Sequence, residues 1–160
     1  MSDYFSIRKA TEADTPVIFS LINQLAEYEK LSDAVITSEE ELRENIFHKG
    51  HAEVLIAEDH NVPVGFALYF YNFSTFVGRP GLYLEDLFVE PEQRGKGYGK
   101  KLFIELAKIA QEKNCGRMEW SVLNWNQPSI DFYKSLDAIP MDEWTVYRLT
   151  QDKIEVLANS

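Results

Sequence analysis

The sequence predicts a mixed α/β fold, with one sheet flanked by about four helices in a single domain over residues 1–160. Two observations predict this class. Short apolar segments alternate with longer segments whose apolar residues recur at helical spacing. A chain of 160 residues with 45% hydrophobic content can also bury a substantial core.

The first half of the chain contains three predicted strands and two predicted helices. Apolar residues recur at helical spacing from Val17 to Ala26, and Pro16 suits the first turn of that helix. Residues 37–40 resemble a capping box that begins a second helix. In chain order we expect a strand at 5–8, a helix that starts at 11–14, the helix after 37–40, a strand at 52–58, a hairpin turn at 59–61 and a strand at 64–71.

In the second half, glycine and proline residues separate the predicted elements. Gly78 and Pro80 mark a loop at 72–81, before a central strand at 82–89. Asn126 is placed to cap a short helix that ends near Leu136. We also expect a helix at 99–113, a strand at 117–122, a last strand at 144–149 and a short polar tail.

Composition limits the classes of function. The net charge of −10 argues against non-specific nucleic-acid binding, which needs a basic face. We interpret the charge as a solvated surface, with an acidic funnel for cationic substrates as the alternative. The single cysteine fits a reducing, cytoplasmic setting, and the chain has neither a membrane-length apolar run nor an apolar leader segment. The three histidines show no metal-ligand spacing, so no metal site is predicted.

The most informative segment is 82–101, an apolar strand that runs into a glycine-rich loop and then a helix. Glycines at 95, 97 and 99 allow backbone N–H groups to approach an anion, and the helix dipole adds to the attraction. Four cations, Arg94, Lys96, Lys100 and Lys101, surround them. The glycine spacing matches neither a P-loop nor a dinucleotide-binding fingerprint. We therefore expect a different phosphate-binding loop, with a merely flexible turn as the alternative.

A second motif covers residues 124–134. Asn126 and Tyr133 are seven residues apart, so on a helix they can face the same side. Asn126 can cap the helix and offer its amide to a ligand, and Tyr133 can project its phenol from that face. The alternatives are a helix cap alone for Asn126 and a packed aromatic side chain for Tyr133.

Taken together, the two motifs resemble the GNAT superfamily of N-acetyltransferases. Arg94-x-x-Gly97-x-Gly99 resembles the family's acetyl-CoA pyrophosphate loop, and N-x-x-[AS]-x-x-[FL]-Y follows about thirty residues later. Segments 25–31, 82–89 and 125–129 are most similar to the diamine (spermidine/spermine) acetyltransferase family, which includes the thialysine acetyltransferases. The resemblance implies the GNAT fold, a mixed and mostly antiparallel sheet, and a homodimer.

The resemblance also implies a site, residue by residue. Acetyl-CoA is the expected co-substrate, and a small cationic amine is the expected partner. Cofactor contacts would come from Leu87, Phe88 and Val89 to the pantetheine arm, from Arg94, Gly95, Lys96, Gly97, Tyr98, Gly99 and Lys100 to the pyrophosphate, and further from Asn126, Gln127, Pro128 and Ser129. Tyr133 would lie near the sulfur. The amine would meet Tyr28, Glu29, Glu85, Glu119, Trp120 and Ser121.

Two departures from the family pattern matter. Asp137 stands where the family usually has glycine, and aspartate tolerates the left-handed backbone that such a turn needs, so we expect the turn to form. Residues 72–76 carry no acidic side chain. Polyamine-specific relatives can place a carboxylate there, so we expect a lysine-like or thialysine-like acceptor slightly ahead of spermidine.

The expected activity is direct acetyl transfer in a ternary complex, without a covalent enzyme intermediate. Glu85 is the expected base, directly or through water, and Tyr133 is the expected acid for the departing sulfur. A strand salt bridge is the alternative role for Glu85. Alternative functions are acetylation of protein N-termini or lysines, and a catalytically idle CoA-binding sensor. The glycine spacing and the acidic charge argue against a nucleotide-binding module.

Overall fold

The computed structural model describes residues 4–160 as two compact units, one ending at Ser121 and one from Val122 to Ser160. The first unit contains a five-stranded sheet in the order β1-β2-β3-β4-β5. All neighbouring strands are antiparallel except β4 and β5, which are parallel. This confirms the mixed, mostly antiparallel sheet. The strands are β1 (Phe5–Lys9), β2 (Glu53–Asp59), β3 (Val62–Ser74), β4 (Arg79–Val89) and β5 (Arg117–Trp120).

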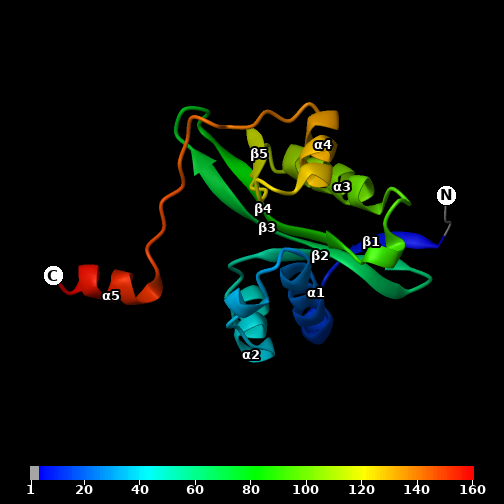
Figure 1. The fold of residues 1–160 in the computed structure, drawn as a ribbon, viewed down its shortest axis with the longest axis horizontal. Helices are drawn as coiled ribbons and strands as arrows, with labels where there is room; N and C mark the ends of the chain where they lie inside the picture. Colours follow the sequence, from blue (N-terminus) through cyan, green and yellow to red (C-terminus); the bar gives the residue numbers. More distant parts are fainter. Residues whose placement is uncertain (1–3) are drawn as a thin grey trace. The chain divides into compact units, whose positions relative to one another are not determined.

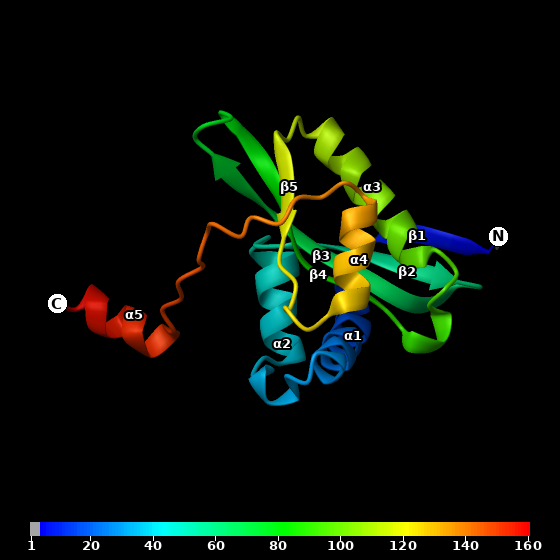
Figure 2. The same cartoon turned by 45° about the horizontal axis from the view of Figure 1, so that its top comes forward.

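Helices cover both faces of this sheet. Helices α1 (Thr15–Tyr28) and α2 (Glu39–Leu42) lie on one face, and α3 (Tyr98–Glu112) lies on the other (Figure 1). Figure 2 shows α3 beside β5 and α1 beside α2 in a second view. The core under α1 consists of Ile18, Leu21, Leu25, Ile46, Val54, Ile56, Phe66, Leu68 and Phe88. Burial of these side chains is the main favourable contribution to folding of the unit.

A partly buried ion pair fixes the start of α1. The Arg8 guanidinium donates to both carboxylate oxygens of Asp14, at 2.7 and 2.9 Å, and the Thr11 backbone N–H donates to Asp14 at 2.7 Å. The bond from Arg8, aided by that from Thr11, lowers the pKa of Asp14 to about 2. Pro16 lies in the first turn as predicted.

Two predicted local features are confirmed, one with a shift. His60 and Asn61 have φ of 52° and 63°, and Asp59 pairs with Val62, so 59–61 forms the expected tight hairpin turn. The cap of α2 is Ser38, whose hydroxyl accepts from the Glu41 N–H at 3.2 Å, one residue after the expected position. The helix then widens into a π-helical turn at Arg43–His48.

The predicted loop at 72–81 is wrong in extent. β3 continues to Ser74 and β4 begins at Arg79, so only 75–78 form the turn. Gly81 lies inside β4, where a Cβ would come within 2.4 Å of Asn72 Oδ1. Pro80, which lacks an N–H, still contributes its carbonyl to the Gly116 N–H at 2.9 Å. Of the two residues that suggested a loop, Gly78 thus belongs to the turn, with φ of +72°, whereas Pro80 lies within β4.

The second unit contains α4 (Gln127–Ser135) and α5 (Gln151–Ala158). Asp137 has φ of 62°, which confirms that aspartate replaces glycine in this turn. The predicted strand at 144–149 is wrong: residues 138–150 form an extended segment, drawn in orange in Figure 1, that leads into α5. A strand needs a hydrogen-bonded neighbour, and Trp144, Val146 and Tyr147 are instead 75%, 84% and 92% exposed. The tail is helical through α5.

Within residues 4–160, none of the helices has the length and apolar character required to cross a membrane.

Candidate functional site

A β-bulge in β4 is the central feature of the candidate site. Leu68 of β3 pairs with Asp86, but the next residue, Tyr69, pairs with Leu84, so Glu85 is the extra residue. Such a bulge redirects side chains. Leu84 lies on the α3 face, whereas Asp86 lies beside Leu68 on the face covered by α1. Glu85 itself is exposed.

Three carboxylates gather at this bulge. Burial, followed by repulsion from Glu85 and Glu29, raises the pKa of Asp86 to about 7. Burial, followed by repulsion from Glu85, also raises the pKa of Glu29, which directly follows α1. Lys30 adopts a left-handed conformation directly after it, with φ of 61°. The predicted pair Glu29 and Glu85 is therefore brought together, and the site can attract a cation.

Asp86 is a site residue that the sequence analysis missed. It follows Glu85 directly, and simple alternation along the strand would place the two side chains on opposite faces. Its signal was a second carboxylate within the apolar strand 82–89, which otherwise reads as buried.

The β4 backbone beyond the bulge has an open edge. β5 pairs only with residues Gly81 to Leu84 of β4. From Glu85 to Val89, that side of β4 has no strand partner in the described part of the first unit. Backbone N–H and C=O groups on such an edge can pair with an extended ligand. Leu87, Phe88 and Val89, predicted to hold the pantetheine arm, lie on this stretch.

The glycine loop has the geometry of an anion site. Gly95 and Gly97 have φ of +82° and +80°, a conformation that side chains rarely adopt, and the positions of their absent Cβ atoms face open space. Gly97 precedes the first residue of α3, where no side chain caps the helix. The backbone N–H groups of this first turn are thus placed for a ligand. The loop can therefore accept a phosphate group, and its role in holding the acetyl-CoA pyrophosphate stays a prediction.

Side chains of the same loop divide between two roles. Lys100 is exposed, and Lys96 Nζ donates to Gln93 Oε1 at 2.7 Å. Tyr98 points inward instead: its ring stacks on Phe5 with centroids 4.0 Å apart, and its hydroxyl donates to Asp59 at 2.7 Å. Tyr98 can therefore contribute only its backbone to the loop, and its side chain anchors α3.

Arg94 links the loop to α1. Its Nε donates to the Val89 carbonyl at 2.9 Å. Its guanidinium lies 4.5 Å from the centre of the Tyr28 ring and 5.3 Å from that of Phe88. The structure therefore brings together a residue predicted for the cofactor and Tyr28, which was predicted for the amine.

The residues predicted on β5 face in two directions. Ser121 lies 3.0 Å from the Tyr83 hydroxyl, and Glu119 pairs with Tyr83 in the sheet register. Trp120 lies on the other face, where its ring packs edge-on against Phe103 of α3 at 5.0 Å. Tyr83, which the sequence analysis did not select, therefore neighbours Glu119 and Ser121 on the face away from α3.

The second motif lies in the second unit. Asn126 Oδ1 accepts from the Ser129 N–H at 3.4 Å, which confirms the predicted cap. Pro128 lies in the first turn of α4, and Gln127 donates to Asp131 at 2.7 Å. Tyr133 is half-buried beside Phe132, with ring centroids 5.8 Å apart. That Asn126 to Ser129 and Tyr133 share a cofactor site with the glycine loop stays a prediction.

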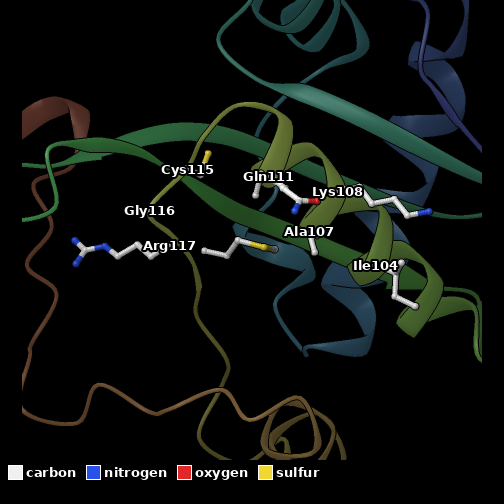
Figure 3. A pocket seen from close by; sticks show the side chains of 9 residues that line it. Ile104, Ala107, Lys108, Gln111, Cys115, Gly116 and Arg117 are labelled. Atoms are coloured by element: carbon white, nitrogen blue, oxygen red, sulfur yellow. The ribbon is translucent and has the colours of Figure 1, made fainter.

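A shallow pocket lies apart from these residues. Figure 3 shows it between α3 and the start of β5. It contains none of the predicted site residues, so we do not assign it to the reaction. Burial raises the pKa of its Cys115 thiol, which keeps that group in its less reactive, protonated form. In residues 4–160, no cluster of three or more His, Cys, Asp or Glu side chains is arranged to hold a metal ion. The pocket is lined by Ile104, Ala107, Lys108, Ala110, Gln111, Cys115, Gly116, Arg117 and Met118.

Comparisons with known proteins agree with this geometry. The model of the acetyltransferase (GNAT) family matches residues 18–137. Thialysine N-epsilon-acetyltransferase of Bos taurus is 40% identical over 97% of this chain and 98% of its own length. The enzyme of that name from Sus scrofa is 42% identical over 95% and 96%. A solved integron cassette protein from the mobile metagenome of V. cholerae superposes with a TM-score of 0.81 at 29% identity, covering 98% of this chain and 99% of that one. The chain therefore belongs to the GNAT family and is an N-acetyltransferase.

Proposed function

We propose that this enzyme transfers acetyl from acetyl-CoA to a small cationic amine, directly within a ternary complex. One observation carries the proposal: β4 presents the carboxylates at its bulge and then an unpaired backbone edge, and the glycine loop follows shortly after its end. An amine, a pantetheine arm and a pyrophosphate can thus be held in sequence along it. The names of the cattle and pig relatives support an amine acceptor.

The residues proposed for the cofactor lie in the sequence on both sides of the boundary at Ser121. The family match runs from residue 18 to 137 and crosses the boundary at Ser121, which supports a single acetyltransferase domain over residues 1–160. In this proposal Gly95 to Lys100 hold the pyrophosphate and Asn126 to Ser129 add contacts from α4. Leu87 to Val89 pair with the pantetheine arm.

Each chemical step has a proposed residue. Glu85 accepts the proton of the ammonium group, directly or through water, and its charge also attracts the cation. The amine nitrogen then bonds to the acetyl carbon as the carbon–sulfur bond breaks. A backbone N–H near Leu87 or Phe88 stabilises the charge on the carbonyl oxygen, and Tyr133 gives a proton to the departing sulfur. The second proton of the nitrogen leaves to solvent as the amide forms, and Tyr133 regains a proton from solvent.

The preferred acceptor in this proposal is a lysine-like or thialysine-like amino acid. Glu29, Glu85 and Asp86 can pair with one or two ammonium groups at the bulge. The turn at 75–78 and its flank from residue 72 carry no carboxylate for the far end of a long polycation. Burying an unpaired ammonium group is costly, so spermidine and spermine should rank lower. Acetylation of protein N-termini or lysines is the second candidate.

A substrate screen tests the function. CoA release from acetyl-CoA should be measured with thialysine, lysine, spermidine, spermine and short peptides. Thialysine or lysine should give the highest kcat/KM. A tenfold preference for spermine would overturn the acceptor but keep the acetyltransferase. Binding of CoA without release in any mixture would support the idle sensor instead.

We also propose a cytoplasmic homodimer. The exposed apolar side chains of Trp144, Val146 and Tyr147 support an interface in the extended segment, since large exposed apolar patches commonly mark contacts. The single cysteine supports the reducing setting. Light scattering at micromolar concentration should give twice the 18.5 kDa chain mass, and a monomer would contradict the dimer.

A further inference from the structure

Arg94 occupies a position between the two halves of the proposed reaction. It belongs to the loop proposed for the cofactor pyrophosphate, yet its guanidinium lies 4.5 Å from the centre of the Tyr28 ring at the end of α1. Its Nε is fixed on the Val89 carbonyl at 2.9 Å, at the end of β4. One side chain therefore contacts the end of β4 and the last residue of α1, directly before Glu29.

The guanidinium can serve both partners at once. It carries five N–H donors in a planar fork, and the bond to Val89 uses only one of them. Its flat face stacks on aromatic rings, while the remaining donors lie at its edge and suit phosphate oxygens. Contact with Tyr28 and contact with a pyrophosphate therefore do not compete for the same surface of Arg94.

The ring that Arg94 contacts is held close to the carboxylates. Tyr28 is the last residue of α1, and Glu29 follows it directly. The helix is closed there by the Leu31 N–H, which donates to the Ala26 carbonyl at 2.8 Å. A shift of Tyr28 would therefore displace Glu29 relative to Glu85. Burial, followed by the charge of Glu85, raises the pKa of Glu29.

We propose that Arg94 is a positioning residue for the amine site: by holding the Tyr28 ring, it links occupancy of the glycine loop to binding of the amine. This inference rests on the proposed function for the location of both ligands. The linkage is reciprocal, because any factor by which CoA tightens amine binding must equal the factor by which the amine tightens CoA binding. A partly exposed cation–π contact corresponds to a factor of about two to five.

Calorimetry on the full chain tests the linkage without depending on turnover. The Kd of thialysine is measured with and without saturating CoA for wild type, Arg94→Lys, Tyr28→Leu and the double variant. Lysine keeps a charge for phosphate but lacks the planar stacking face, and leucine removes the ring. Lys108→Gln, on the exposed surface of α3, is the control for loss of one positive charge.

In wild type and Lys108→Gln, CoA should tighten thialysine binding by about two- to fivefold. This factor should fall to one in Arg94→Lys and in Tyr28→Leu, and the double variant should lose no more than either single variant. In steady-state assays, Arg94→Lys should raise the thialysine KM by the same factor while kcat changes little.

Two different failures are distinguishable. If wild type binds CoA but does not bind thialysine, the proposed acceptor is wrong and this inference falls with it. If wild type shows the linkage and Arg94→Lys keeps it, or if the two single effects simply add, Arg94 acts only as a phosphate ligand and the positioning role is rejected.

Discussion

Glu85 is exposed only because it is the extra residue of the bulge, and this position makes it testable as a base. Glu85→Gln removes the proton acceptor while keeping the shape of the side chain. Acetylation should fall strongly at neutral pH and recover in part as pH rises, because unprotonated amine then becomes available without a base. The pH–rate profile checks this, with Glu112→Gln on the surface of α3 as control. An unchanged profile would show that Glu85 is not the base.

Gly97 combines a left-handed backbone with an open approach for a ligand. Gly97→Val adds both strain and bulk at the proposed pyrophosphate, so the KM for acetyl-CoA should rise by about tenfold or more. The matched control is Gly50→Val, since Gly50 has φ of +67° and equally open surroundings elsewhere in the chain. Calorimetric affinity for CoA separates the two, and equal affinities in both variants would reject the loop assignment.

The Tyr133 phenol has a proposed role only when the carbon–sulfur bond breaks. Tyr133→Phe should therefore lower kcat by about 100- to 10,000-fold while CoA affinity changes little. A chemistry-limited rate measurement is required, and Tyr4→Phe, a 65% exposed tyrosine in the first unit, is the control. A kcat equal to wild type would leave Tyr133 as a packing residue beside Phe132.

The Arg8–Asp14 pair operates at the scale of an element, because it fixes the start of α1. Its stabilisation is fully present above the ordinary aspartate pKa of 3.8 and is lost as pH falls through the folded-state pKa of about 2. Asp14→Asn should therefore lower the free energy of unfolding by about 1–2 kcal/mol at pH 7, and by much less at pH 2. Denaturant unfolding at the two pH values measures this, and exposed Asp33→Asn should change neither. An equal deficit for Asp14→Asn at both pH values would show that packing, not charge, is lost.

Elements with a local cause could be predicted from the sequence, whereas elements set by distant partners could not. The turn at 59–61, the Asn126 cap and the Asp137 turn each depend on a few adjacent residues, and all three formed as expected. The bulge at Glu85 depends on the register between β3 and β4, which no window along one strand contains. The segment 144–149 has the residues of a strand, but the described chain provides it with no partner.

The same distinction applies to the candidate site. The glycine loop is local, and its positive φ angles follow from glycine itself. The contact between Arg94 and Tyr28 joins residues 66 positions apart, and the burial of Asp86 results from the placement of α1 over β4. Both depend on tertiary packing. The sequence therefore indicated which functional groups the site contains, but not which of them contact one another.

At the scale of the whole molecule, Asp86 should make unfolding depend on pH. Its folded-state pKa of about 7 lies above the ordinary value of 3.8, so between these values the folded chain keeps a proton that the unfolded chain has released. Stability should therefore fall as pH rises from about 4 to 7. Asp86→Asn removes this loss. At pH 8 the free energy of unfolding of the variant should therefore exceed that of the wild type by about 2–4 kcal/mol.

Denaturant unfolding at pH 4.5, 6 and 8 measures the effect. The difference between the variant and the wild type should be smallest at pH 4.5, because this value lies closest to the ordinary aspartate pKa of 3.8 and little of the loss has accumulated there. If the stability of the variant still declines between pH 4.5 and 7 as in the wild type, the titrating group is Glu29 instead. Burial raises the pKa of Glu29 as well.

The bulge also makes the number of residues in β4 critical for its core packing. Leu84 and Phe88 are both buried, yet they lie on opposite faces of the sheet because one residue was added between them. Deleting Glu85 would restore strict alternation and turn one half of the strand inside out, exposing either the leucines under α3 or the phenylalanine under α1. Substitution of Glu85 removes one functional group, whereas its deletion would expose core side chains and destabilise the fold. Gains and losses of single residues should therefore be tolerated in the turn at 75–78 and excluded between Leu84 and Asp86.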